Sequence, residues 1–359
     1  MAKQRVVVAM SGGVDSSLAA AILDAEGYQV IGVTLQIWPS NKKEANGVER
    51  FGGCCGLEAI ESAKSVAHKL GIPHYVMNFR DIFAQTVIAD FCREYSRGHT
   101  PNPCIVCNQR VKFGPLLDRA LQMEADYLAT GHYARIEPSA NGYSLWKGVD
   151  RSKDQSYFLY PLGPKELQHL LFPLGNMHKT EVRRRAAELG LPTAARRDSQ
   201  DICFIPDNDY RSFIARHISL KPGDIVDTEG KVLGRHSGLA RYTIGQRQGL
   251  GLASNERRYV LKIDADNNRL VAGTHNQLSK SRLLASQLSW VSGKAPGEPI
   301  EVTAKVRYRS PEIAARLHIN DGIAEVQFHQ PQRAIAPGQA IVFYQGDAVL
   351  GGGIIDEAT

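Results

Sequence analysis

The chain has 359 residues, which is too long for one typical core and predicts two or three domains. Its formal net charge is +6. Its 43% hydrophobic and 22% charged residues are ordinary for a globular enzyme and exclude a disordered chain. The longest apolar runs, such as 6–10 and 30–35, are far too short to cross a bilayer, and no leader pattern precedes them. We therefore expect a cytoplasmic protein without membrane association.

Short buried strands alternate with amphipathic helices in the N-terminal part. Such alternation predicts right-handed crossovers and a doubly wound parallel sheet, hence an α/β catalytic domain. Apolar, β-branched runs predict the strands, and apolar residues at helical spacing, stopped by glycines, predict the helices. The expected strands are 6–10, 30–35, 74–79 and 127–130, and the expected helices are 16–26, 57–70 and 82–97.

The segment SGGVDSS at 11–17 lies between the first expected strand and the first expected helix. Its two glycines permit a tight turn, its serines add hydroxyl donors, and the helix N-terminus adds N–H groups and a positive dipole end. A Walker lysine and a GxGxxG fingerprint are both absent. A glycine turn with a serine cap is common by itself, but the order strand, SGGxDSS, helix predicts a cradle for phosphate.

The pattern changes near residue 205. After a helix at 210–217, short alternating segments with turn signals predict strands. We expect a catalytic domain over 1–205, a small β-rich central domain over 206–280 and a C-terminal β-barrel-like domain over 281–359. The expected strands are 225–227, 259–264, 269–272, 300–307, 314–317, 322–328 and 340–344.

Six cysteines occur, and only Cys104 and Cys107 form a C-x-x-C pair, so a structural zinc spacing is not completed. Prolines and Gly98 predict a rigid loop over 100–108 that cannot join a helix or a central strand, a setting that suits nucleophilic chemistry. Nearby basic residues and the next helix N-terminus would lower a thiol pKa. Cys203 has two readings, a buried core thiol or a reactive one. The remaining cysteines are Cys54, Cys55 and Cys92.

Basic residues form two clusters along the chain. They fit either solvated helix and loop faces or a surface that binds a polyanion, and charge alone does not decide between them. The clusters are Arg183, Arg184, Arg185, Arg196 and Arg197, then Arg235, Arg241, Arg247, Arg257 and Arg258.

Taken together, the motifs resemble one family. SGGVDSS resembles the PP-loop of ATP pyrophosphatases, which cleave ATP between the α- and β-phosphates and adenylate an oxygen. Five further motifs follow along the chain: TPNPCxxCN at 100–108 with KFG, ATGHYAR at 129–135, KDQSYFLY at 153–160, SQDICFI at 199–205 and YTIGQRQGLG at 242–251. The complete set of motifs, from Val6 to Gly353, resembles the bacterial tRNA-specific 2-thiouridylases.

The resemblance implies roles residue by residue. Cys107 matches the nucleophile, and Cys203 matches the cysteine that carries a persulfide. Some members have an aspartate, viewed as an acid or base, at the position of Cys104, so that role does not carry over to this chain. ATP-contacting positions are Ala9, Met10, Ser11, Gly12, Gly13, Val14, Asp15, Ser16, Leu35 and Gly131, with Asp15 also expected to hold Mg²⁺. tRNA-contacting positions are Asn102, Pro103, Cys104, His132, Lys153, Asp154, Gln155, Arg307, Tyr308 and Gln339.

The implied reaction is adenylation of the C2 oxygen of the wobble uridine, followed by sulfur transfer, with ATP and Mg²⁺ as cofactors. The implied partners are tRNAs with lysine-, glutamate- or glutamine-type anticodons and a sulfur-relay or cysteine desulfurase donor; we expect a monomer. Three alternatives stay open: a PP-loop ligase for a small molecule, an RNA-binding protein with an iron–sulfur cluster on Cys104, Cys107 and Cys203, and an RNA-binding module without activity. The last leaves the phosphate loop unexplained.

Overall fold

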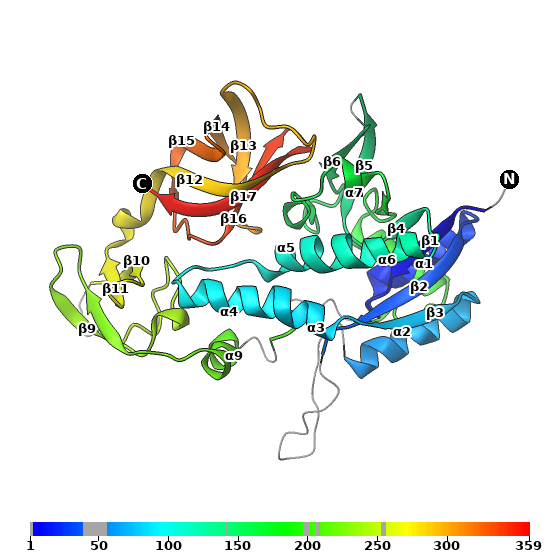
Figure 1. Cartoon of the computed structure of the whole chain (residues 1–359), viewed down its shortest axis with the longest axis horizontal. Helices are drawn as coiled ribbons and strands as arrows, with labels where there is room; N and C mark the ends of the chain where they lie inside the picture. The colour runs from blue at the N-terminus through cyan, green and yellow to red at the C-terminus, as the bar shows by residue number, and fades with distance from the viewer. Residues whose placement is uncertain (1–2, 39–55, 141, 197–201, 206–208, 253–255) are drawn as a thin grey trace, which may run out of the picture. The chain divides into compact units, whose positions relative to one another are not determined.

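The computed structural model describes residues 3–38, 56–140, 142–196, 202–205, 209–252 and 256–359 (Figure 1). Contacts divide the chain into two compact units. The first unit comprises Met1–Val87, Cys104–Asn208 and Asp347–Val349, and the second comprises Ile88–Pro103, Asp209–Gly346 and Leu350–Thr359. Cys54, Cys55, Arg197 and Ser199–Asp201, all noted in the sequence, lie outside the described residues.

The first unit contains a five-stranded parallel sheet in the order β3-β2-β1-β4-β7. Its central strand is completely buried at Val6, Val7 and Val8, as expected for a β-branched apolar run covered on both faces. The expected doubly wound α/β fold is therefore confirmed. The strands are β1 (Arg5–Ala9), β2 (Gln29–Gln36), β3 (His74–Asn78), β4 (Tyr127–Ala129) and β7 (Leu170–Leu171).

Three helices share a core with β1, on the face of the sheet that carries Val6 and Val8. Leu18, Val66 and Val182, one from each helix, are completely buried there. These helices are α1 (Val14–Ala25), α2 (Leu57–Leu70) and α8 (Lys179–Glu188). The other helical segments of this unit are α3 (Arg80–Phe83), η1 (Ala84–Ile88), α5 (Pro103–Cys107), η2 (Asn108–Leu116), α6 (Leu117–Gln122), η3 (Ser156–Phe158) and α7 (Pro164–Leu167).

A hairpin of β5 (Ala134–Ser139) and β6 (Gly142–Lys147) completes the first unit. Neither strand, nor helix α8, was predicted from the sequence. Ala348 pairs with Trp146 of this hairpin, which is why a short piece of the C-terminal chain belongs to the first unit.

In the second unit, α4 (Ala89–Ser96) packs against α9 (Tyr210–His217). The contact is aromatic: the rings of Phe91 and Phe213 are 6.1 Å apart, and those of Tyr95 and Tyr210 stack at 5.5 Å. Rings at these separations add to the stabilisation that burial provides. An N-terminal helix is thus built into the core of the C-terminal part of the chain.

Two β-structures make up the rest of the second unit. The smaller is a four-stranded sheet, β10-β11-β8-β9, around the buried residues Ile225, Val260 and Leu270. The larger is a closed barrel, because β12 pairs with both β15 and β17 in the order β12-β15-β14-β13-β16-β17 (Figure 1, yellow to red). The predicted β-rich and barrel-like parts are confirmed as fold class.

The bounds of these strands and short helices are as follows. The smaller sheet has β8 (Gly223–Val226), β9 (Val232–His236), β10 (Tyr259–Asp264) and β11 (Arg269–Gly273). The barrel has β12 (Ser279–Trp290), β13 (Ile300–Lys305), β14 (Ile313–Asn320), β15 (Ile323–Arg333), β16 (Ala340–Gln345) and β17 (Ala348–Ala358). The short helix η5 (Leu239–Arg241) lies between β9 and β10, and η6 (His275–Leu278) directly precedes β12.

The prediction of a loop over 100–108 is wrong for its second half. Pro103–Cys107 is the helix α5, and it runs on through the π-helix η2 into α6. A proline is tolerated in the first turn of a helix, where its missing N–H would have no intrahelical partner. Pro115 lies within η2, whose wider turn accommodates the interrupted hydrogen-bond ladder.

The predicted helix over 82–97 is helical throughout but has a π-helical turn, η1, between α3 and α4. No helix among the described residues is long and apolar enough to cross a membrane.

Candidate active site

The predicted ATP-contacting residues of the first unit gather at one edge of its sheet. Met10 follows β1, Leu35 lies near the end of β2, and Gly131 comes two residues after β4. These three strands are parallel neighbours, so their carboxyl ends meet at one edge. The chain reverses its strand order at β1, and ligands of open α/β sheets bind at such a switch point.

Serine hydroxyls fix the shape of the loop between β1 and α1. The Ser11 N–H donates to Ser16 Oγ at 3.1 Å, and the two hydroxyl oxygens are 3.2 Å apart. Ser16 Oγ and Ser17 Oγ both donate to the carbonyl oxygen of Gly13, at 3.2 and 2.8 Å. These bonds hold the loop against the start of α1, where backbone N–H groups and the helix dipole favour an anion.

Two glycines are required because the backbone passes close to other segments. Gly12 has φ +71°, and a Cβ there would lie 2.3 Å from the carbonyl oxygen of Ala59 in α2. A Cβ on Gly131 would lie 2.7 Å from the carbonyl carbon of Asp15. Gly131 thus brings the segment after β4 into contact with the first turn of α1, which explains why both segments contribute to one site.

Asp15, in the first turn of α1, is held by two side chains that are distant in sequence. The ammonium of Lys179 donates to both carboxylate oxygens at 2.7 Å, and the Tyr133 hydroxyl donates to Oδ1 at 2.7 Å. The Lys179 side chain is only 10% exposed, whereas Asp15 is 33% exposed. The ion pair is therefore shielded on the lysine side and reaches solvent on the carboxylate side.

Asp150 fixes the start of α8, the helix that carries Lys179. The Lys179 backbone N–H donates to Asp150 Oδ2 at 2.9 Å, and Ser152 donates to Oδ1 through both its N–H and its hydroxyl. Burial raises the pKa of Asp150, but these hydrogen bonds outweigh it and hold that pKa below its ordinary value. The helix start and its lysine are thereby fixed in place.

Arg196 braces the loop from another direction. Its Nη1 donates to the carbonyl oxygen of Gly12 at 3.0 Å and to Ser62 Oγ at 2.6 Å, and its Nη2 lies 3.3 Å from Glu58. Arg196 therefore links the loop to α2. By contrast, Arg184 is paired with Glu181 on its own helix, as on an ordinary solvated face.

Cys104 and Cys107 lie three residues apart in α5, so they face the same side of the helix. Cys104 is exposed and Cys107 is partly exposed. The nearest helix N-terminus is thus the start of α5 at Pro103, before both cysteines, and not that of a following helix as predicted. Asn108, buried directly after Cys107, donates to the carbonyl oxygen of Phe158 at 3.2 Å.

Cys203 lies in a turn next to an anchored aromatic residue. The Ile205 N–H closes the turn onto the carbonyl oxygen of Ile202 at 2.9 Å. Phe204 is 1% exposed, and its ring meets that of Phe83 edge-on at 5.6 Å. Cys203 itself is partly exposed, so the reading of a fully buried core thiol is wrong.

His132 is held as a neutral imidazole. Its Nδ1 lies 2.7 Å from Thr130 Oγ1, and its ring packs against both Phe113 and Phe172, with centroids 5.8 Å from each. Burial, helped by the positive charge of Lys112, holds the pKa of His132 well below its ordinary value. A neutral ring suits a hydrogen bond or a stacking contact with a base better than an ion pair with phosphate.

The segment from Lys153 to Gln155 is bonded to its own surroundings. The buried carboxylate of Asp154 accepts from the N–H groups of Gly148 and Ser156 and from the Ser156 hydroxyl. Gln155 exchanges two hydrogen bonds with the backbone of Tyr133. Asp154 and Gln155 thus hold the segment that positions Tyr133, and their contact with tRNA stays a prediction.

In the second unit, Arg307 is exposed in the turn after β13, with Tyr308 partly exposed beside it. This strand ends at Lys305, two residues earlier than predicted, because a turn closed by Ser310 begins there. An exposed arginine in a turn can reach a phosphate without losing another contact.

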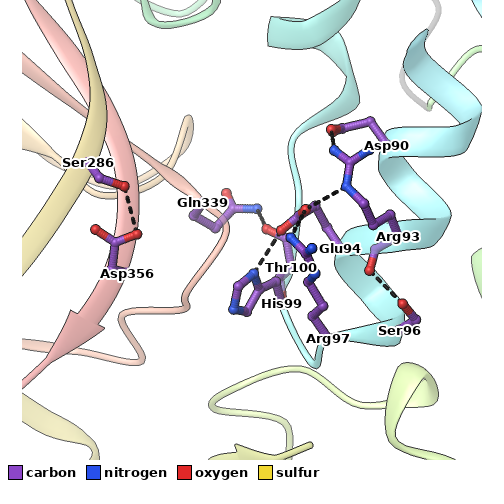
Figure 2. Close-up of polar contacts among 10 residues, drawn as sticks. All are labelled: Asp90, Arg93, Glu94, Ser96, Arg97, His99, Thr100, Ser286, Gln339 and Asp356. Carbon is purple, nitrogen blue, oxygen red and sulfur yellow. Dashed lines mark hydrogen bonds and ion pairs between the residues drawn. The ribbon is translucent and has the colours of Figure 1, made fainter.

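Gln339 contacts the segment that leads to α5 (Figure 2). Its side-chain amide donates to the carbonyl oxygen of Thr100 at 2.7 Å, and the Thr100 N–H donates to the carbonyl oxygen of Pro337 at 2.8 Å. His99 is held in turn by Glu94, whose carboxylate lies 2.8 Å from its Nδ1. Asn102 and Pro103 follow directly in the chain.

Sequence reasoning missed Tyr133, Asp150 and Lys179 as members of the site. Tyr133 is part of the ATGHYAR motif, which could have indicated it, but no spacing connects it with Asp15. Lys179 is a single lysine at the start of an unpredicted helix. Among the described residues, no group of three or more His, Cys, Asp or Glu side chains comes together to hold a metal ion.

Comparison with known proteins agrees with this architecture. Three family models match in succession: a "tRNA methyl transferase HUP domain" at residues 4–207, a "tRNA methyl transferase PRC-barrel domain" at 211–274 and an "Aminomethyltransferase beta-barrel domain" at 280–355. The parallel sheet with SGGVDSS at its carboxyl edge places the first unit in the class of HUP-type, PP-loop nucleotide-binding domains.

The relatives define the family more narrowly. The chain is 51% identical to the tRNA-specific 2-thiouridylase MnmA of Acetivibrio thermocellus, over 99% of this chain and 100% of that protein. It is 54% identical to the MnmA of Heliobacterium modesticaldum, over 98% of this chain and 92% of that protein. The chain belongs to the tRNA-specific 2-thiouridylase family. Among solved structures the similarity is weak: a 4-thiouridine synthetase–RNA complex with bound ATP gives a TM-score of 0.34 at 14% identity, over 59% of this chain and 50% of that one.

Proposed function

We propose that this chain is a tRNA-specific 2-thiouridylase. It uses ATP to adenylate the C2 oxygen of the wobble uridine and replaces that oxygen with sulfur, giving 2-thiouridine, AMP and pyrophosphate. The observation that carries the proposal is identity of about half of all residues with named 2-thiouridylases over nearly the whole of both chains.

The geometry of the first unit supports the activation step. The uracil C2 oxygen is a poor leaving group, and attack on the α-phosphorus of ATP converts it into an AMP ester that leaves readily. The loop from Ser11 to Ser16, with the start of α1, presents N–H and hydroxyl groups suited to hold the triphosphate. Leu35 and Gly131 lie at the same sheet edge, where the rest of the nucleotide would bind.

Asp15 fits a role beside Mg²⁺ through a water molecule. Lys179 and Tyr133 occupy three of the four lone-pair positions of its carboxylate, so one position on Oδ2 is left among the contacts of the described residues. Magnesium usually keeps several waters and binds one or two carboxylates together with phosphates. When bound, the ion would neutralise charge on the leaving pyrophosphate.

The two cysteines provide the sulfur step. A persulfide on Cys203 delivers its terminal sulfur to C2, either directly or after Cys107 attacks the persulfide and frees hydrosulfide. In the direct route the terminal sulfur bonds to C2 as AMP leaves, and Cys107 then attacks Cys203 Sγ and breaks the S–S bond, which leaves the sulfur on C2. In the other route the freed hydrosulfide displaces AMP from C2. Both routes leave a Cys107–Cys203 disulfide. That disulfide must be reduced by a thiol reductant before the next turnover. The persulfide comes from a sulfur-relay or cysteine desulfurase donor.

tRNA recognition involves both units. The target base must be unstacked to reach the site, which is the usual mode for RNA loops. Asn102, Pro103 and Cys104 would lie beside that base, and His132 offers it a neutral ring. Arg307 and Tyr308 would contact the tRNA backbone.

Mass analysis of tRNA nucleosides tests the proposal. The purified chain, unmodified tRNA with a lysine-, glutamate- or glutamine-type anticodon, ATP–Mg²⁺ and a persulfide donor should yield 2-thiouridine. Asp15→Ala should abolish pyrophosphate release and leave tRNA binding largely intact, because Asp15 acts on the nucleotide side. Absence of thiolated nucleoside with the wild-type chain, or full activity of Asp15→Ala, would contradict the proposal.

A further inference from the structure

The lysine absent from the phosphate loop is replaced, in space, by one from another helix. Lys179 is the first residue of α8, 164 residues from Asp15, yet its ammonium lies 2.7 Å from both oxygens of that carboxylate. The Tyr133 ring centroid is 5.7 Å from the same ammonium, close enough for a cation–π contact. The fold therefore places a shielded positive charge at the N-terminal turn of α1.

The direction of these contacts indicates what the charge does. The ammonium donates to both carboxylate oxygens of Asp15, and the backbone of Lys179 is fixed by Asp150. A buried charge needs a partner to offset its lost hydration, and Asp15 provides one. These contacts direct the ammonium to the carboxylate.

An uncompensated Asp15 would oppose nucleotide binding. A triphosphate carries several negative charges, and a bare carboxylate in the same first turn would repel them in partly shielded surroundings. Pairing with Lys179 offsets the charge of Asp15 and fixes the orientation of its carboxylate. The favourable dipole of α1 can then act on the phosphates.

We propose that Lys179 is the positioning residue of the ATP site, orienting the Asp15 carboxylate and cancelling its charge where the triphosphate binds. This inference rests on the proposed function, because it assumes that the cradle holds ATP. It assigns Lys179 an action through Asp15 and no direct contact with phosphate.

A double-mutant cycle tests this assignment. ATP and AMP affinities would be measured without Mg²⁺, which would otherwise bridge the carboxylate and the phosphates, by isothermal titration calorimetry for the wild type, Lys179→Met, Asp15→Asn and the double variant. Lys179→Met should weaken ATP binding by about tenfold or more, and AMP binding by much less, because the unpaired carboxylate repels the outer phosphates. In the Asp15→Asn background the same substitution should change ATP affinity by less than about threefold.

Two further variants keep the result interpretable. Lys179→Arg, which retains a charge able to pair with a carboxylate, should restore most of the ATP affinity. Lys165→Met on the exposed surface of α7 is the matched control and should bind ATP like the wild type. Thermal unfolding of each variant checks that the first unit is folded.

The outcomes separate the possibilities. An equal loss of ATP affinity on Lys179→Met in the wild-type and Asp15→Asn backgrounds would show that Lys179 contacts phosphate directly. Wild-type ATP affinity of Lys179→Met would show that Lys179 acts neither through Asp15 nor on phosphate. Each result overturns the inference. Failure of the wild-type chain to bind ATP would instead overturn the proposed function.

Discussion

Cys203 and Cys107 act after activation in the proposed reaction, so their loss should leave the first step intact. Cys203→Ser removes the persulfide carrier without touching the nucleotide loop. We expect this variant to bind ATP and tRNA and to release pyrophosphate in a tRNA-dependent manner, yet to make no 2-thiouridine. Nucleoside mass analysis beside a pyrophosphate assay measures both steps. Thiolation by Cys203→Ser would show that the carrier assignment is wrong.

The cysteines of α5 should differ from one another. Cys107→Ser should block turnover while Cys203 still accepts sulfur, seen as a mass increase of the intact protein after incubation with the donor. Cys104→Ser should lower activity by less than about tenfold, or ~1.4 kcal/mol, if that thiol takes no part in the chemistry. Loss of activity in all three variants together with a brown chromophore would favour the iron–sulfur alternative.

The half-buried imidazole of His132 should make acid destabilising. Its pKa in the folded chain is lowered, so the unfolded chain binds a proton first as the pH falls below about 6.5, the ordinary value. This contribution to stability is therefore complete above that pH and is lost below it, by at most ~1.4 kcal/mol per pH unit. His74 and His236 act in the same direction.

Histidine-selective NMR measures this directly. The His132 signal, assigned by its loss in His132→Asn, should stay that of a neutral ring down to pH values below 6, and unfolding of His132→Asn should depend less on pH. A titration midpoint of 6.5 or higher would contradict the prediction.

At this scale the sequence indicated the SGGVDSS loop as a candidate phosphate cradle but not the side chains that support it. SGGVDSS is local, and its predicted role follows from a turn and a helix start that neighbouring residues form. Tyr133 and Lys179 reach Asp15 only because β4 and α8 pack beside β1 and α1. That packing depends on tertiary structure, which no spacing along the chain encodes.

Among the elements, the connection between Ala336 and Gln339 should be sensitive to a single methyl group. Gly338 has φ +86°, and a Cβ there would lie 2.7 Å from the Cβ of His99. Gly338→Ala must therefore bear backbone strain of ~1 kcal/mol and also separate this connection from Thr100. We expect a loss of ~2–4 kcal/mol in the free energy of unfolding, measured by chemical denaturation.

Gly322 is the matched control for that substitution. It has a similar φ, +77°, but a Cβ there meets nothing within 4 Å. Gly322→Ala should cost only the backbone strain, ~1 kcal/mol. Equal stability of the two variants would show that the contact between Gly338 and His99 is not a tight one.

The wrong loop prediction over 100–108 also belongs to the scale of elements. Two prolines and Gly98 argue against a helix interior, but Pro103 is the first residue of one, where proline is favoured. The second proline, Pro101, lies outside the helix. The same residues that signal a break therefore also mark a helix start, and only the residues that follow distinguish the two.

For the molecule as a whole, affinity for tRNA should depend steeply on salt. If phosphate contacts dominate, the logarithm of the association constant for tRNA should fall with the logarithm of the salt concentration, with a slope of roughly 0.7–0.9 for each phosphate contact. Arg307→Ala should reduce the slope by the amount that corresponds to about one contact, as measured by filter binding at several salt concentrations. Binding that does not change with salt would contradict an electrostatic tRNA surface.

Arg184→Ala provides the comparison for Arg307. Arg184 is exposed but bonded to Glu181 and Glu188 on its own helix, so its charge is already matched. Its removal should leave the salt slope unchanged. An equal change in both variants would mean that net charge, and not a specific contact, sets the slope.

The expected domain order of 1–205, 206–280 and 281–359 follows the chain, whereas the compact units do not. Periodicity predicts that residues 82–97 are helical but not where that helix packs. The aromatic face of α4, with Phe91 and Tyr95, finds its partners only in α9, more than a hundred residues later. Sequence patterns thus predict elements, whereas the compact units depend on contacts between segments that are far apart in the chain.

This interleaving has a consequence for biosynthesis. Domains usually fold in order as they leave the ribosome. Here α4 emerges long before Phe213 and Tyr210, so its aromatic face stays exposed while much of the chain is still being made. The first unit in turn receives Asp347–Val349 from far along the chain. Neither unit can therefore complete its folding until distant segments of the chain have been made, and a fragment beginning at Asp209 would lack the helix that covers α9.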